Sequence, residues 1–320
     1  MDNYNEEKSY GGLSKAEKAR KAAKKRLKRF ILCCVIVLCL CISCVMEVCG
    51  VWTGLFSMLG ICSVYVESSE YPLAVTVCDV GSANCVLIRC EGYNVLVDCG
   101  LEKLQGNVLN KLKAADTDML DLVILTHPDK DHIGNMRNVA DSVAIQSFVT
   151  CRNGDYELTD IYNELVSKLE YRNIAIEYAE CGAVYVFGNM TLRVVSPNKV
   201  YDSSNDNSVV IRLEYGEFSM LLTGDAGKDS ESDMLDRGEY IKSDVLLAGH
   251  HGSGSSTTGD FLSAVDPSDA VISVEQSDYL PNDSTMQRLI EYGCTIYRTD
   301  KSGDITIVSD GTGYKILTQY

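Results

Sequence analysis

The chain has 320 residues and a hydrophobic fraction of 46%, which suits one large folded domain with appended segments. Residues 1–29 carry ten Lys or Arg and four Asp or Glu, a net charge of +6, whereas the remainder carries 19 and 41, a net of −22. The opposite signs indicate two electrostatically distinct parts, and the acidic part argues against a protein that binds nucleic acid through its overall charge.

The N-terminal region predicts a single membrane anchor. Residues 1–29 form a basic cytoplasmic tail in this interpretation, and the 17-residue run from Phe30 to Met46 has Ser43 as its one polar residue. We expect a transmembrane helix over residues 30–50, longer toward 66 if it continues past Glu47, and a stalk over 51–70.

The distribution of basic residues predicts the orientation of this anchor. Nine Lys or Arg lie within residues 15–29 and none from 30 to 88, which places the N-terminus in the cytoplasm and the remainder outside. A cleaved signal peptide is the first alternative, but the basic leader is long and no small-x-small cleavage site follows. A buried core helix is the second, and the uninterrupted apolarity beside a basic flank argues against it.

The cysteines do not predict a disulfide framework. Six of the 14 lie in or beside the apolar run, where they act as small hydrophobic residues. Seven lie beyond residue 71, an odd number without regular spacing, and several fall in apolar runs, so buried free thiols are expected.

From residue 71 onward, short β-type runs alternate with helical stretches. The first set predicts strands at 73–78, 85–89 and 93–97, a helix at 104–115, a strand at 122–126, a helix from about 135, a strand at 144–150 and a helix at 157–171. The second set predicts strands at 183–187, 191–195, 208–214, 218–223, 244–248, 270–274, 295–298, 305–308 and 314–317, with helices after 256 and at 285–292. Such mixed content predicts one domain over 71–320 with two sheets packed face to face and helices outside.

The strongest chemical signal follows the strand predicted at 122–126. All four histidines of the chain fall in two short motifs, and the first pair, His127 and His132, is interleaved with Asp129 and Asp131. Alternate residues of an extended loop can direct two ligands at one cation, and these side chains are typical ligands of Zn²⁺, Mn²⁺ or Fe²⁺. The alternative is a polar loop in which Asp131 caps the next helix.

Two later strand ends carry further candidates. Asp225, in Thr-Gly-Asp, could bridge two cations through its two oxygens, although a plain turn also explains an Asp beside Gly. In His-His-Gly-Ser, one histidine is expected to be a ligand, with His251 preferred, and His250 to contact substrate or protonate a leaving group. The loop from Ser253 to Thr257 offers hydroxyl and N–H groups to an anion, or is a flexible turn.

Three further polar residues are candidates for supporting roles. Asp98 ends a strand before a glycine and could hydrogen-bond a ligand imidazole, or serve as a turn residue. Asn207 and Ser208 have a weaker claim to contact the ligand side chains or the substrate, as has the segment Asp79-Val-Gly81, and all of them could be turn residues.

The ordered motifs resemble the metallo-β-lactamase fold and, more narrowly, the soluble domain of ComEC-type competence proteins. They are Asp79-Val-Gly81, Val97-Asp-Cys-Gly100, His127 to Gly134, Asn207-Ser208, Thr223 to Asp225 and His250 to Ser253, within residues 72–320. The resemblance implies an αββα sandwich of two mixed sheets with a dinuclear site at one edge. His127, Asp129 and Asp225 would hold one cation, and Asp131, His132, Asp225 and His250 or His251 the other.

Two departures from the broader superfamily modify this expectation. Asp129 stands where His is usual, and no histidine lies between His132 and His250, so the first cation would have few protein ligands and be weakly held, or be Mn²⁺ rather than Zn²⁺. The chain also has one predicted membrane helix where ComEC proteins have many, so DNA transport by this chain alone is not expected.

The resulting functional hypothesis is a membrane-anchored, extracytoplasmic metallohydrolase with two divalent cations that generate a hydroxide. Asp131, Asp225 and His250 are the expected catalytic residues, and a phosphodiester, including DNA, is the expected substrate. One alternative is hydrolysis of a small ester, lactone or amide, because the acidic domain repels polyanions. The other is an anchored binding module that holds little metal.

Overall fold

The computed structural model describes residues 24, 26, 28, 70–154 and 158–320. The chain divides into two units, residues 1–59 and 60–320, and the second contains the α/β domain. The predicted basic tail, transmembrane helix and stalk lie almost wholly outside the described residues. Within the described part of the chain, no helix is long and apolar enough to cross a membrane.

The first sheet has the strand order β17-β16-β1-β2-β3-β5-β7-β8. Its strands are β1 (Leu73–Val77), β2 (Val86–Cys90), β3 (Tyr93–Val97), β5 (Leu122–Leu125), β7 (Phe148–Thr150), β8 (Ile176–Tyr178), β16 (Ile305–Ser309) and β17 (Tyr314–Thr318). Antiparallel pairing joins β17, β16, β1, β2 and β3, and parallel pairing continues through β5, β7 and β8. The strands β1, β3, β5, β7 and β8 therefore all end at one edge.

The second sheet has the order β15-β14-β13-β12-β11-β10-β9. Its strands are β9 (Val184–Phe187), β10 (Met190–Ser196), β11 (Val210–Tyr215), β12 (Phe218–Leu222), β13 (Val245–Leu247), β14 (Asp269–Ile272) and β15 (Thr295–Arg298). Pairing is antiparallel from β9 to β12 and parallel from β12 to β15, so β10, β12, β13 and β14 also end at a common edge.

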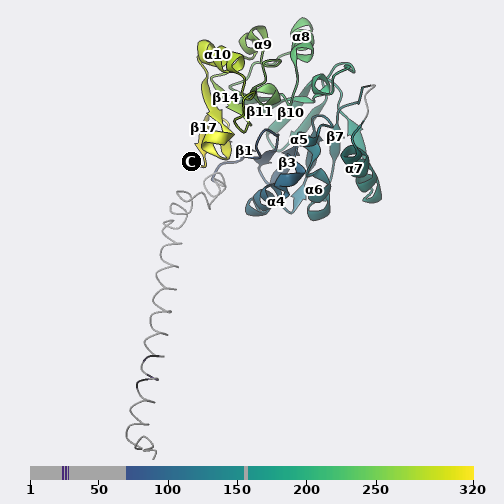
Figure 1. The fold of residues 1–320 in the computed structure, drawn as a ribbon, viewed down its shortest axis with the longest axis vertical. Helices are drawn as coiled ribbons and strands as arrows, with labels where there is room; N and C mark the ends of the chain where they lie inside the picture. The colour runs from purple at the N-terminus through teal and green to yellow at the C-terminus, as the bar shows by residue number, and fades with distance from the viewer. Residues whose placement is uncertain (1–23, 25, 27, 29–69, 155–157) are drawn as a thin grey trace, which may run out of the picture. The chain divides into compact units, whose positions relative to one another are not determined.

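Three apolar clusters define the layers, which are those of the predicted αββα sandwich. The central cluster contains inward residues of both sheets, such as Val75 and Ile124 from the first and Leu213 and Met220 from the second. A second cluster packs the outer face of the first sheet against α4 (Gln105–Ala114), α6 (Met136–Ser142) and α7 (Asp160–Tyr171). A third packs the second sheet against α8 (Lys228–Asp236), α9 (Gly259–Val265) and α10 (Asp283–Tyr292), so the helices cover opposite faces of the paired sheets (Figure 1).

The structure corrects three expectations about single elements. The strand predicted at 144–150 is two pieces: β6 (Ala144–Ile145) pairs with β4 (Met119–Leu120), and β7 joins the large sheet. Helix α8 was not expected, because its sequence is mostly polar and Met234 is its one fully buried large apolar residue. The helix expected from about residue 135 is preceded by the short α5 (Lys130–Ile133), which carries part of the first histidine motif.

The seven cysteines beyond residue 71 are free thiols, as expected, and five of them are buried. Cys78, Cys85 and Cys99 belong to the cluster between the first sheet and its helices. Burial raises the pKa of Cys99 well above its usual value, so this thiol stays protonated and unreactive.

Candidate metal centre

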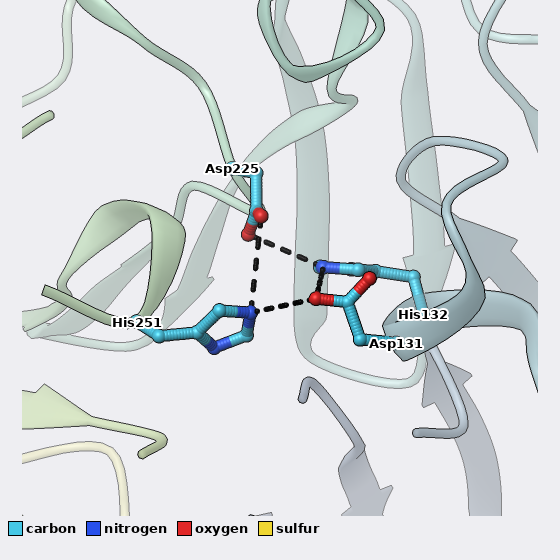
Figure 2. Close-up of side chains that lie close together, drawn as sticks. All are labelled: Asp131, His132, Asp225 and His251. Atoms are coloured by element: carbon cyan, nitrogen blue, oxygen red, sulfur yellow. Dashed lines mark hydrogen bonds and ion pairs between the residues drawn. The ribbon is translucent and has the colours of Figure 1, made fainter. Parts of the chain in front are cut away.

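The predicted site residues come together where strands of both sheets end. His127 to His132 follow β5 and include α5, Asp225 follows β12, and the turn that contains His250 and His251 follows β13. Because these strands end at the common edges of two packed sheets, loops that are 120 residues apart in the sequence meet there. Figure 2 shows Asp131, His132, Asp225 and His251 pointing toward one another across this junction.

Four side chains form a compact group of possible ligands. One ligand atom from each of Asp131, His132, Asp225 and His251 lies within 4.8 Å of the others. His132 Nε2 is 3.2 Å from Asp225 Oδ1, and His251 Nε2 is 3.3 Å from Asp131 Oδ2. A tetrahedral cation with bonds of about 2.0–2.1 Å holds its ligands roughly 3.3 Å apart, so this group has the dimensions of a cation site.

The hydrogen-bonding state of the buried atoms supports the same fit. His127 Nε2, His132 Nε2 and Asp225 Oδ1 are buried and have no partner with the geometry of a hydrogen bond, although the last two face each other at 3.2 Å. Buried polar atoms without partners are rare, because each one costs the free energy of its lost hydration. Three such atoms converging at one place, all with lone pairs available, match the donor set of a divalent cation.

A second group shares the Asp225 carboxylate. His127 Nε2 lies 3.6 Å from Asp129 Oδ2 and 4.0 Å from Asp225 Oδ2, and His250 Nε2 lies 3.6 Å from the same Asp225 oxygen. These distances are longer than those of the first group, and Asp129 is exposed at 42%. The arrangement agrees with the expectation of a second, more weakly held cation, which stays a prediction.

Outer hydrogen bonds fix the imidazole rings. Asp98 Oδ2 lies 2.7 Å from His132 Nδ1 and accepts a bond from the Thr126 hydroxyl, while Asp98 Oδ1 accepts the Thr126 N–H. His251 Nδ1 donates to the Ser273 carbonyl at 2.9 Å, which leaves its Nε2 as the acceptor that faces the cluster. Such partners orient ligand imidazoles and set their tautomers.

Charges within the cluster shift the pKa of its members in complementary directions. Burial opposes the ionisation of Asp225, but the neighbouring His132 and His251 hold the pKa of this carboxyl well below its usual range. Burial likewise lowers the pKa of His132, and the charges of Asp225 and Asp98 outweigh it and raise that pKa well above its usual value. The carboxylates thus favour positive charge here, which either protons or a bound cation can supply.

The backbone at the site is strained. His250 and His251 both have positive φ, 50° and 54°, and Asp98 has a φ of 57°. Non-glycine residues in this region cost free energy and cluster at functional sites. Two consecutive histidines in this conformation make a tight turn that sends His251 into the cluster, where it is 2% exposed, and leaves the His250 side chain 31% exposed.

The remaining predicted residues lie around this cluster rather than in it. Ser208 Oγ is 3.3 Å from His127 Nδ1 and accepts the Asp225 N–H, so it links the two cation groups. Asn207 bonds both the N–H and the carbonyl of Tyr201, and therefore organises its own loop. Ser253 Oγ pairs with Ser255 Oγ on an exposed loop, and Ser255 lines a cavity together with Asp225 and His250.

Sequence reasoning missed several contributors. Thr126 lies between Asp98 and both first-motif histidines, Ser204 donates to Asp129 at 3.1 Å, and the Asn205 amide lies 3.3 Å from His250 Nδ1. Thr126 directly precedes His127 in the sequence, and this position could have indicated its role. Ser204 and Asn205 gave none, because their contacts span 75 and 45 residues of sequence.

A cavity of about 320 Å³ opens beside the second group of ligands. His250 and Asp225 line it together with Asn205, Lys228 and Ser255, which supply further polar groups. Asp206 and Asp229 line it as well, so the cavity offers both donors and acidic groups to a substrate.

Comparison with known proteins identifies relatives of the domain. The chain is 32% identical to ComE operon protein 3 of Bacillus subtilis (strain 168) over 197 residues, 61% of this chain and 25% of that protein. It is 30% identical to Competence protein ComA of Neisseria gonorrhoeae over 239 residues, 73% of this chain and 32% of that protein. The predicted resemblance to ComEC-type competence proteins is thereby confirmed, and the chain spans about a quarter to a third of the length of these relatives.

Solved structures share the fold at low sequence identity. CmlA, a diiron beta-hydroxylase from Streptomyces venezuelae, matches with a TM-score of 0.54 and 13% identity over 75% of this chain and 54% of that one. The metallo-beta-lactamase fold protein YhfI from Bacillus subtilis matches with a TM-score of 0.50 and 14% identity over 73% of this chain and 99% of that one. The family model of the metallo-beta-lactamase superfamily matches residues 78–276, more than half of the sequence, and the chain therefore belongs to that superfamily.

Proposed function

We propose that this chain is a membrane-anchored, extracytoplasmic hydrolase that uses divalent cations to cleave phosphodiesters. One observation carries the proposal: buried imidazole and carboxylate atoms without hydrogen-bond partners converge next to a cavity that has its own polar groups. The similarity to competence proteins favours nucleic acid as the source of the phosphodiester.

The ligand set fits divalent cations, Zn²⁺ or Mn²⁺, held by His132, Asp131, Asp225 and His251, with a second beside His127 and Asp129. When bound, such cations supply Lewis-acid chemistry, which activates water at neutral pH and stabilises negative charge on the scissile group. The two carboxylate oxygens of Asp225 face different histidines, Oδ1 toward His132 and Oδ2 toward His127, so this side chain would be shared by the two cation sites.

The remaining residues would bind substrate and move a proton. His250 is the partly exposed histidine of the site and lines the cavity, so its Nε2 can deliver a proton to the departing oxygen. Lys228 and Ser255, which line the same cavity, can hold the non-bridging oxygens of a phosphate. Asp98 and Ser273 hold the ring orientations of His132 and His251 during this step.

A small neutral substrate is the second candidate. Asp206 and Asp229 line the same cavity as Lys228, and their charge disfavours a polyanion there. An ester, lactone or amide would tolerate these carboxylates and would still be polarised by a bound cation.

The test compares the two substrate classes on the full-length chain. With Mn²⁺ or Zn²⁺, bis(p-nitrophenyl) phosphate and an oligonucleotide should be hydrolysed, and chelation should abolish the reaction. His132→Ala should abolish it as well, whereas Asp236→Asn, an exposed carboxylate at the end of α8, should have wild-type rates. Turnover of an ester or lactone without phosphodiester turnover would transfer the assignment to the second candidate. Absence of both reactions and of bound metal would favour a binding module.

A further inference from the structure

We propose that the pocket lined by Arg152 and Lys199 is a second substrate subsite, which binds the phosphate and base of a single-stranded nucleic acid next to the cleaved bond. This inference rests on the proposed phosphodiesterase function and names the polymer that it acts on. The pocket has a volume of about 340 Å³, and Glu180 and Asn198 are its other charged and amide-bearing lining residues. We call it the Arg152 pocket.

The topology places the Arg152 pocket at the same edge as the candidate metal centre. In the first sheet Leu125 of β5 pairs with Thr150 of β7. His127 lies two residues after Leu125, and Arg152 lies two residues after Thr150, so both leave the sheet at the same level. Neighbouring strands are about 4.8 Å apart, which makes the loop that begins with Arg152 the direct neighbour of the loop that carries His127. Ala179, which follows β8 and bonds the Thr150 carbonyl, extends this edge into the pocket.

The second sheet contributes the opposite wall from its corresponding edge. Strand β10 ends at Ser196, and β10 runs parallel to β12, whose end leads to Asp225. The segment 197–200 therefore leaves the sheet at the edge of the candidate metal centre and lines the pocket. A few residues later Ser204 donates a hydrogen bond to Asp129 at 3.1 Å, so the same loop joins the Arg152 pocket to the ligand cluster.

The chemistry of the pocket suits a phosphate with an attached base. The Arg152 guanidinium lies over the Tyr178 ring at 4.9 Å from its centroid, and Lys199 Nζ lies 5.0 Å from the centroid of Tyr201. The sequence alone shows no basic aromatic stripe, because the two pairs come from distant parts of the chain: Arg152 follows β7 and Tyr178 ends β8, whereas Lys199 and Tyr201 share the loop after β10. Cations beside aromatic rings are the combination with which proteins bind single strands, since every base can stack on a ring.

Exposure leaves these groups available to a ligand. Arg152 and Lys199 are exposed at 57% and 58%, and Tyr178 at 44%, whereas Tyr201 is buried, so Tyr178 is the ring of the two that is open to a base. Their carboxylate partners, Glu180 at 3.6 Å and Asp233 at 3.4 Å, form solvent-exposed or loose pairs of the kind that contribute little to stability. A phosphate can therefore replace these carboxylates at small cost, whereas a duplex would keep its bases stacked away from Tyr178.

The decisive variant is Arg152→Ala/Lys199→Ala in the full-length chain. Its matched control is Lys242→Ala/Lys315→Ala, which removes the same charge. Lys242 is 59% exposed and paired with Asp266, and it precedes β13, so it lies at the edge opposite the centre. Lys315 lies over the Tyr71 ring, as Lys199 lies over Tyr201.

We expect the Arg152/Lys199 variant to raise KM for a fluorescent single-stranded 12-mer about tenfold, since two solvent-exposed ion pairs with phosphates are lost. Its kcat/KM for bis(p-nitrophenyl) phosphate, which is too short to reach the pocket, should equal that of wild type. The slope of a plot of log Kd for the 12-mer against log salt concentration should decrease by about 1.4, which is about 0.7 for each of two lost phosphate contacts. The conservative Arg152→Lys/Lys199→Arg variant should retain most of the wild-type affinity.

The outcomes separate this inference from the proposed function. If wild type cleaves the 12-mer and the Arg152/Lys199 variant and its control behave alike, the subsite is wrong and the function stands. If wild type cleaves no phosphodiester, 12-mer binding in EDTA decides by fluorescence anisotropy. If wild type and the control bind the 12-mer and the Arg152/Lys199 variant does not, the subsite is retained although the proposed reaction is wrong. If wild type does not bind the 12-mer, the subsite is overturned as well. A preference for duplex over single strand would also overturn it.

Discussion

The two adjacent histidines of the second motif have different surroundings and therefore different expected roles. His251 is 2% exposed, donates through Nδ1 to the Ser273 carbonyl and directs Nε2 at Asp131 and Asp225. His250 is 31% exposed, contacts Asn205 and lines the cavity. The preference for His251 as ligand and His250 as the substrate-facing residue therefore stays a prediction, which these surroundings make testable, since His250 Nε2 also lies 3.6 Å from Asp225.

This difference predicts opposite results for two neighbouring substitutions, each of which serves as the control for the other. His251→Ala should lower metal affinity by more than the 10–100-fold that is typical of an outer-shell partner, because a direct ligand is removed. His250→Ala should retain its metal and lower kcat by roughly 10²–10⁴, the usual contribution of a general acid. Elemental analysis of the purified full-length variants and steady-state rates would measure both. Loss of metal in His250→Ala alone would reverse the assignment.

At the scale of elements, α8 and α10 hold the loop that follows the second motif. Glu231 of α8 is 2% exposed, and its carboxylate accepts the N–H groups of Thr257 at 2.5 Å and Thr258 at 2.9 Å. Arg288 of α10 donates to the Thr257 carbonyl, and Thr257 itself has a positive φ of 53°. The Thr257 hydroxyl accepts the Gly249 N–H, so this arrangement reaches the turn of His250 and His251.

Glu231 should make stability depend on pH in a recognisable way. Burial raises its pKa above the ordinary 4.5, although the Thr258 and Thr257 bonds and the charge of Arg288 oppose the rise. The folded protein therefore binds this proton more tightly than the unfolded chain, and the stabilisation that is present below about pH 4.5 is lost as pH rises through the folded pKa. Glu231→Gln cannot titrate, so its free energy of unfolding relative to wild type should rise over that window and then level off.

Urea unfolding of the full-length chain at intervals from about pH 4 to pH 8 would measure this difference. Glu291→Gln, an exposed carboxyl on α10, should follow wild type in parallel across the same range. The loss of one acceptor in Glu231→Gln adds an offset that does not change with pH. A constant difference between Glu231→Gln and wild type would contradict the assignment.

The elements that sequence patterns missed share a physical cause. Helix α8 has few apolar residues, and its position depends on buried polar contacts, such as Ser230 with Ser196 and Glu231 with the Thr257 loop. Strand β8 is a partly exposed edge strand of three residues, too short for a visible alternation. The similarly short strands β5 and β13 were predicted within one residue at each end, because both faces of these strands are buried and their residues form uninterrupted apolar runs.

At the scale of the whole molecule, sequence reasoning found the motifs but not how they meet. His127 to His132 form a local pattern that predicts a metal site without a structure. The proximity of Asp131 to His251, 120 residues later, follows only from the packing of two sheets. Before the structure, the family resemblance was the one indication that these two residues share a site. The Lys199–Tyr201 pair is local in the sequence, but the pocket itself has no local signal, since Arg152 and Lys199 are brought together only where strands of the two sheets end.

The charge distribution along the whole chain predicts that the catalytic domain lies outside the cytoplasm. Residues 15–29 contain nine Lys or Arg, and none occurs from 30 to 88, so the basic flank should stay in the cytoplasm while the acidic domain is exported. Alkaline phosphatase fused after Tyr320 should be active in a bacterial host, and β-galactosidase at the same point should not.

Replacement of Lys24, Lys25, Arg26 and Lys28 by Ser should reduce or invert this orientation, because the positive charge beside the apolar run determines it. The same number of Ser substitutions at exposed basic residues of the domain, Lys103, Lys113, Lys242 and Lys315, should leave it unchanged, since charges far from the run contribute little. A β-galactosidase fusion that is active in the wild-type chain would place the domain in the cytoplasm. The Arg152 pocket would then meet intracellular rather than external nucleic acid.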